Sequence, residues 1–273
     1  MNEAAVLTDA QEMVFSAGTL LGYGITGVLY ILLPIIAFLL MYKYKAARIF
    51  PVFIGILVYF LSTKMCDLSV WIFFSSVPYA VKAALSVEFV GIFEETGRWL
   101  AIKYPVFNLK TAEKAICCGI GHAGLECWIR GVQSFKLINI GQELNLRGLS
   151  AFNEGKTKIQ AEEITRQLSS YANRNLFISL LDSVNIITNF GMHIALTLFI
   201  FRRLQKDSRD KKCLILAILL HAAHNEISGL ASLSGSMIIS SLISIATGIA
   251  VIVFVMKKID GRAIIDDIIY PEI

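Results

Sequence analysis

Charge is scarce in this chain. Charged residues make up 17% of its 273 residues and apolar residues make up 56%, whereas a typical soluble domain is about 25% charged and about 45–50% apolar. The mean hydropathy is +0.65, and apolar runs of roughly twenty residues, the length that crosses a bilayer, recur along the chain. This composition excludes an ordinary soluble domain and predicts an all-α fold, a polytopic transmembrane helical bundle.

Cysteine motifs and a basic leader segment are also missing. The five cysteines are odd in number and none form a C-x-x-C pair, which argues against a disulfide framework and against a cysteine zinc site. Residues 1–11 carry Glu3 and Asp9 rather than a basic segment, so we expect no cleavable signal peptide. Lysines and arginines gather in short loops, which indicates membrane topology, and we expect no nucleic-acid partner.

The apolar segments predict about seven to eight membrane helices in one domain that comprises residues 1–273. Residues 68–81 are shorter and contain Pro78, so they are predicted to form a re-entrant or interfacial helix, with a bent eighth crossing as the alternative. The charged stretch 141–175 is too polar to insert and is predicted to be an extramembrane insertion. The predicted full crossings cover about 17–42, 50–61, 84–103, 115–137, 176–201, 213–233 and 236–256.

The basic loops test this count, because lysine and arginine accumulate on the cytoplasmic side of a membrane. If the chain crosses seven times and starts outside, all the basic clusters face the cytoplasm. This pattern predicts an integral protein of a bacterial cytoplasmic membrane, with the N-terminus outside and the C-terminus cytoplasmic. The clusters lie at 43–48, 103–114, 202–212 and 257–258.

All four histidines lie inside these apolar segments, together with several acidic residues. An ionisable group at membrane depth costs free energy, and its default interpretation is a functional site. One such residue on each of four segments lies about eight or nine residues from a basic cluster, roughly 12–14 Å below the cytoplasmic surface. We therefore predict one polar layer, open toward the cytoplasm. The four residues whose depth was calculated in this way are Glu94, His122, His193 and His221.

Polar residues within these segments recur at i,i+4 and therefore share a helix face. Any single pair can be a structural ion pair or hydrogen bond, but several pairs in one layer indicate chemistry. Glu95 points about 100° away from Glu94. His224 is the weakest candidate of the four histidines and is expected to pack. The pairs are Glu94 with Arg98, His122 with Glu126, and His221 with Asn225.

The string from Gly119 to Gly124 matches the G-x-G-x-x-G pattern of dinucleotide sites. We reject that function, because no strand precedes the string and a membrane segment cannot form the βαβ unit that such a site needs. The glycines are interpreted instead as small residues that let helices approach closely.

A polar layer of this kind can activate water in two ways. A carboxylate and an imidazole can share the water as general base. Alternatively, His and Glu side chains can hold a zinc ion, which lowers the pKa of its bound water to about 7. His221 and Asn225 would then donate hydrogen bonds to an oxyanion. If a metal is bound, its predicted ligands are Glu126, His193 and His221, and no other cofactor is expected.

Four strings, EETGR, GIGHAGLE, FGMHIALT and HAAHN, occur in this order between residues 84 and 226. They resemble the four motifs of the YhfC family, which belongs to the broader group of CAAX-protease-like and PrsW-type intramembrane proteases. The PrsW pattern of EExxK, FxxxE, a His and HxxxN is matched in spacing, with Arg98 in place of Lys and His122 in place of Phe. In the CAAX branch, the first motif is one residue longer and the second ends in His, where this chain has Glu126.

The resemblance implies an intramembrane endopeptidase of glutamic or metallo type. Its substrate would be a membrane-embedded or membrane-proximal peptide, and the lipid bilayer would surround the site. The implied roles are Glu94 as the water-activating base, Glu95 and Arg98 as orienting residues, Glu126 and His193 as water or metal ligands with His122 nearby, and His221 and Asn225 as oxyanion donors.

Two other classes of function are compatible with intramembrane polar residues. A proton-coupled transporter also uses chains of Glu and His, but the polar helices show no inverted repeat, which many transporters have. A non-catalytic membrane scaffold or immunity protein would use the polar pairs only for packing, which is a costly use of so many in one layer.

Overall fold

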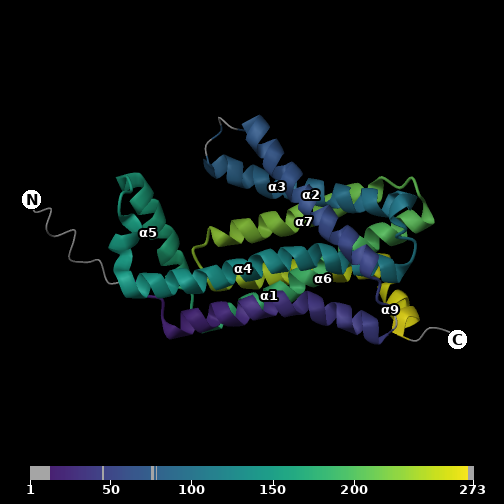
Figure 1. Cartoon of the computed structure of the whole chain (residues 1–273). Helices are drawn as coiled ribbons and strands as arrows, with labels where there is room; N and C mark the ends of the chain where they lie inside the picture. Colours follow the sequence, from purple (N-terminus) through teal and green to yellow (C-terminus); the bar gives the residue numbers. More distant parts are fainter. Residues whose placement is uncertain (1–12, 45, 75–76, 78, 270–273) are drawn as a thin grey trace, which may run out of the picture. The chain divides into compact units, whose positions relative to one another are not determined.

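The computed structural model describes residues 13–44, 46–74, 77 and 79–269, and most of these residues are helical (Figure 1). The predicted all-α bundle is confirmed. Glu3, Asp9 and Pro78, which entered the sequence predictions, lie outside the described residues. The helices are α1 (Ala17–Lys43), α2 (Ile49–Phe74), α3 (Tyr79–Lys103), the 3₁₀ helix η2 (Pro105–Phe107), α4 (Ala112–Asn153), α5 (Lys158–Ala172), α6 (Leu176–Lys206), α7 (Lys212–Ser232), α8 (Met237–Lys258) and α9 (Gly261–Ile269).

Among the described residues, five helices are long and apolar enough to cross a membrane: α1, α2, α6, α7 and α8. Helices α3 and α4 coincide with the predicted crossings 84–103 and 115–137 but are less apolar, because they carry many charged residues. The number of crossings, seven to eight, stays a prediction. Helix α9 was not expected from the sequence.

The structure corrects the separation of residues 50–61 from 68–81, because α2 runs unbroken from Ile49 to Phe74. The polar residues between the two stretches lower the local hydropathy but do not end the helix. Lys64 and Asp67 form an exposed ion pair at 3.0 Å, one turn apart on α2. The Thr63 hydroxyl donates to the carbonyls of Tyr59 and Phe60 at 3.1 Å and 2.9 Å.

The stretch 141–175, predicted as a polar insertion, is largely helical. Helix α4 continues to Asn153, and it bends at Gly148, whose φ of 73° favours glycine. Helix α5 then starts with a capping box, because Thr157 and Gln160 each bond the other's backbone N–H. This stretch belongs to a compact unit formed by Met1–Tyr30 and Ile129–Ser183.

A second compact unit comprises Ile31–Trp128 and Val184–Ile273 and contains every predicted site residue. The single domain predicted from the sequence stays a prediction. Within this unit α6 is the central helix, since 67% of its most apolar stretch is buried, more than in any of the other four apolar helices. Its core cluster includes Trp99, Met192, Leu196 and Phe199.

Helix α4 packs closely through the glycines of the rejected dinucleotide string, as the alternative interpretation expected. A Cβ on any of the three would press on a different neighbouring helix. Because His122 lies in the middle of this string, the close packing also determines where its imidazole is held. The facing residues are Ile194 of α6 for Gly119, Val52 of α2 for Gly121, and Pro34 of α1 for Gly124.

The α6–α7 connection ties these helices to the end of α3. The Asp210 carboxylate accepts hydrogen bonds from the Arg203 guanidinium and from the Lys212 N–H, and its carbonyl accepts one from the Trp99 indole at 3.3 Å. Burial disfavours the ionised Asp210, but the Arg203 guanidinium and the backbone N–H groups outweigh it and lower its pKa. Trp99 directly follows Arg98, so this connection helps to position the candidate site.

We predict that Gly121→Ala destabilises the protein by about 1–3 kcal/mol. The added Cβ would overlap the backbone of Val52, which cannot move without shifting α2. Gly229→Ala on α7 is the control, since its Cβ would meet nothing within 4 Å and alanine favours a helix. Unfolding by SDS in mixed micelles measures both variants. Equal stability of Gly121→Ala and the wild-type protein would refute this account of α4 packing.

Candidate active site

Six of the eight predicted site residues form one buried cluster, supplied by α3, α4, α6 and α7. None of the six is more than 5% exposed. Ionisable side chains are rarely buried this completely unless they are paired. The cluster consists of Glu94, Glu95, Arg98, His122, His193 and His221.

Arg98 lies at the centre of this cluster. One terminal nitrogen, Nη1, pairs with the Glu95 carboxylate. The other, Nη2, lies 2.5 Å from His193 Nδ1, 2.6 Å from His122 Nε2 and 3.3 Å from Glu94 Oε2. A single guanidinium therefore joins side chains from α3, α4 and α6.

The contacts of Arg98 and Glu126 indicate which nitrogen of His193 carries the proton. His122 Nε2 is faced both by the Arg98 donor at 2.6 Å and by the acceptor oxygen Glu94 Oε2 at 3.0 Å. For His193 the assignment is simpler: a guanidinium can only donate hydrogen bonds, so Nδ1 must accept. In neutral histidine the proton is then on the other ring nitrogen. For His193 that nitrogen is Nε2, which donates to Glu126 Oε2 at 3.0 Å. His193 thus turns an unprotonated nitrogen toward the centre of the cluster, and His122 turns its Nε2 atom to the same place.

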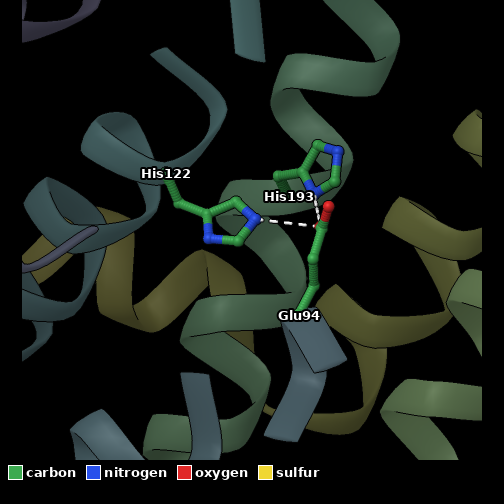
Figure 2. Close-up of side chains that lie close together, drawn as sticks. All are labelled: Glu94, His122 and His193. Atoms are coloured by element: carbon green, nitrogen blue, oxygen red, sulfur yellow. Dashed lines mark hydrogen bonds and ion pairs between the residues drawn. The ribbon is translucent and has the colours of Figure 1, made fainter. Parts of the chain in front are cut away.

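Three of these side chains have the geometry of a metal site. Donor atoms of Glu94, His122 and His193 all lie within 4.8 Å of one another. Figure 2 shows both imidazole rings directed at the Glu94 carboxylate. Two histidines and a glutamate are a known ligand set of catalytic zinc, which keeps its fourth position for water or substrate. The residues present therefore fit a zinc ion.

This group differs from the ligands predicted from the sequence, Glu126, His193 and His221. Only His193 is common to both sets. Glu126 contacts the outer nitrogen of His193, the position of a carboxylate that orients a metal-bound histidine. His221 turns its Nδ1 to Glu95 Oε1 at 2.8 Å, and its ring meets the His193 ring edge-on at 5.2 Å. The ligand roles of Glu126 and His221 stay predictions.

Two further polar residues of α7 differ in their surroundings. His224 is buried, and its Nδ1 lies 2.9 Å from the Thr247 hydroxyl of α8, so it packs α7 against α8. Asn225 is half-buried, and within the described part of the chain no hydrogen bond joins it to the cluster. Its role as an oxyanion donor stays a prediction.

Helix α2 also contributes to the site, which was not predicted from the sequence. The Tyr59 ring meets the His122 ring edge-on, with centroids 5.2 Å apart. The Ser62 hydroxyl donates to the carbonyl of Phe93, the residue before Glu94, at 3.0 Å. These contacts hold α2 against both α3 and α4 beside the cluster. A tyrosine and a serine in an apolar helix are too common to have marked a site in advance.

Comparisons with known proteins point to one family. A family model described as YhfC intramembrane metalloprotease matches residues 29–253, a range that contains the whole cluster. No curated protein and no solved structure is found to match the chain.

We predict that Glu95→Gln destabilises the protein by about 3 kcal/mol, because it removes the closer of the two carboxylates that pair with the buried Arg98 charge. Glu163→Gln is the matched control, since Glu163 pairs with Arg166 at the same i,i+3 spacing but on an exposed surface. Exposed pairs contribute little to stability, so the control should unfold like the wild-type protein. If both variants unfold alike in SDS titrations, the Glu95–Arg98 pair is not a stabilising element.

Proposed function

The chain belongs to the YhfC intramembrane metalloprotease family, and on this premise we propose that it is an endopeptidase that cleaves a peptide bond within the bilayer. Its metal ion would be held by Glu94, His122 and His193. The chain is an integral membrane protein. The observation that carries the proposal is the convergence of these three buried donors within 4.8 Å of one another.

The contacts of His193 support metal binding. A histidine binds a metal through an unprotonated nitrogen, and His193 turns such a nitrogen, Nδ1, toward Arg98. Glu126 accepts a hydrogen bond from the proton-bearing nitrogen of His193, Nε2, and this bond keeps the ring in its orientation. A zinc ion bound here would polarise the scissile carbonyl and lower the pKa of its water to about 7.

The remaining residues would handle protons and developing charge. Glu94 has two carboxylate oxygens, and the Oε2 atom faces His122 and Arg98. Its other oxygen can accept a proton from the attacking water, the role predicted from the sequence. His221 donates from Nδ1 to Glu95. In its imidazolium form, it would donate from Nε2 to the oxyanion, with Asn225 one turn further along α7 as a second donor.

The substrate would be a membrane-embedded or membrane-proximal peptide, because the ligands are buried in a cluster to which α6 and α7, two helices apolar enough to cross a membrane, contribute. Entry of water from the cytoplasmic side follows from the depth calculated along the helices. An outside N-terminus and a cytoplasmic C-terminus complete this orientation, in a bacterial cytoplasmic membrane.

We predict that His193→Ala loses bound zinc and peptide cleavage, since it removes one of three ligands. Glu126→Gln should keep the site but bind zinc about 10–100-fold more weakly, because it removes only the orienting carboxylate. Zinc content is measured by elemental mass spectrometry of purified protein. Cleavage is measured by comparing the membrane-protein fragments in cells that express the wild-type protein with those in cells that express each variant.

His224→Gln is the control, because His224 bonds Thr247 rather than the ligand group. It should retain both zinc and cleavage. Wild-type levels of cleavage in folded His193→Ala protein would rule out the proposed function.

A further inference from the structure

The Arg98 guanidinium occupies the position that the proposed metal ion would need. Its Nη2 atom is 2.5 Å from His193 Nδ1, 2.6 Å from His122 Nε2 and 3.3 Å from Glu94 Oε2. These residues are the same three that form the candidate ligand group. A cation bound to all three would therefore touch the guanidinium, and two positive charges in contact repel strongly in a buried site.

The cluster also contains three buried polar atoms that have no partner in the described part of the chain, Glu95 Oε2, Arg98 Nε and His122 Nδ1. Such atoms cost free energy when they stay unpaired. An arginine can pair with both oxygens of a carboxylate through two parallel hydrogen bonds. A pairing of Nε and Nη2 with the two oxygens of Glu95 would satisfy two of these three atoms, Glu95 Oε2 and Arg98 Nε. It would also move Nη2 away from His122, His193 and Glu94.

We propose that Arg98 is a positioning residue that competes with the metal for the ligand group. Without a bound cation, the guanidinium holds Glu94, His122 and His193 together through the contacts of its Nη2 atom. When a divalent cation binds, the guanidinium withdraws to a two-bond pairing with Glu95. This inference rests on the proposed function, because it needs a metal in that group.

The arrangement has a physical consequence for affinity. If the guanidinium occupies the ligand group in nine of ten molecules, the apparent dissociation constant of the metal rises about tenfold. Arg98 would thus weaken metal binding while it stabilises the empty site. If Arg98 only held the ligand side chains in place, its loss would displace those side chains and weaken metal binding.

The test compares the affinity of Arg98→Met and wild-type protein for Zn²⁺ in detergent, by competition with a chromogenic chelator. We expect Arg98→Met to bind Zn²⁺ about tenfold more tightly or better. We also expect it to unfold more easily than the wild-type protein in excess chelator, and to gain more stability on zinc addition. Unchanged or weaker zinc binding by Arg98→Met would overturn the proposal.

Arg98→Lys separates physical occupancy from a simple effect of charge, and it serves if Arg98→Met does not fold. It keeps the positive charge, but one ammonium nitrogen cannot pair with Glu95 and also fill the ligand group. Occupancy predicts tighter zinc binding than in the wild-type protein, whereas charge alone predicts no change and would refute the proposal.

Arg166→Met is the matched control, since this exposed arginine pairs with Glu163 at the same i,i+3 spacing. It should bind zinc like the wild-type protein. If neither the wild-type protein nor any variant binds zinc, the proposed function fails together with this inference. If the wild-type protein binds zinc through His193 but loss of Arg98 does not tighten binding, only this inference fails.

Discussion

Burial of one guanidinium is the constraint on which the centre of this protein depends. Arg98 is fully buried and always charged, and removing an ion from water costs several kcal/mol unless good partners compensate. The partners come from Glu94 and Glu95 on its own helix and from His122 and His193 on α4 and α6. Helices α3, α4 and α6 are therefore held to one arrangement by the needs of a single charge.

Close helix packing makes this arrangement possible. The glycines on both sides of His122 let α4 touch three neighbours, and Gly55 of α2 faces the backbone of His122 in the same way. Inside a bilayer, apolar side chains gain little by contacting each other instead of lipid, so close contact and polar bonding carry more of the association. The same glycines thus bring the polar side chains within bonding distance and exclude lipid from them.

The sequence predicted the layer but not its internal bonding. Polar residues in apolar segments are conspicuous, and their depth follows from counting along a helix, so four helices and six clustered residues could be anticipated. Which atoms face each other depends on helix rotation and side-chain torsions, which spacing leaves open. Glu94 and His122 therefore join His193 in the candidate metal group, rather than Glu126 and His221. The continuity of α2 was missed because its polar middle lowers hydropathy without breaking a hydrogen-bonded helix.

The claim that Glu94, His122 and His193 hold a metal ion is tested most directly by zinc X-ray absorption spectroscopy of the purified protein. We expect two imidazole nitrogens among nitrogen and oxygen ligands, without sulfur. In His122→Ala, one imidazole should be lost from the zinc that remains. Two imidazoles retained in His122→Ala, as expected if His193 and His221 were the ligands, or sulfur bound to zinc in the wild-type protein, would contradict the account.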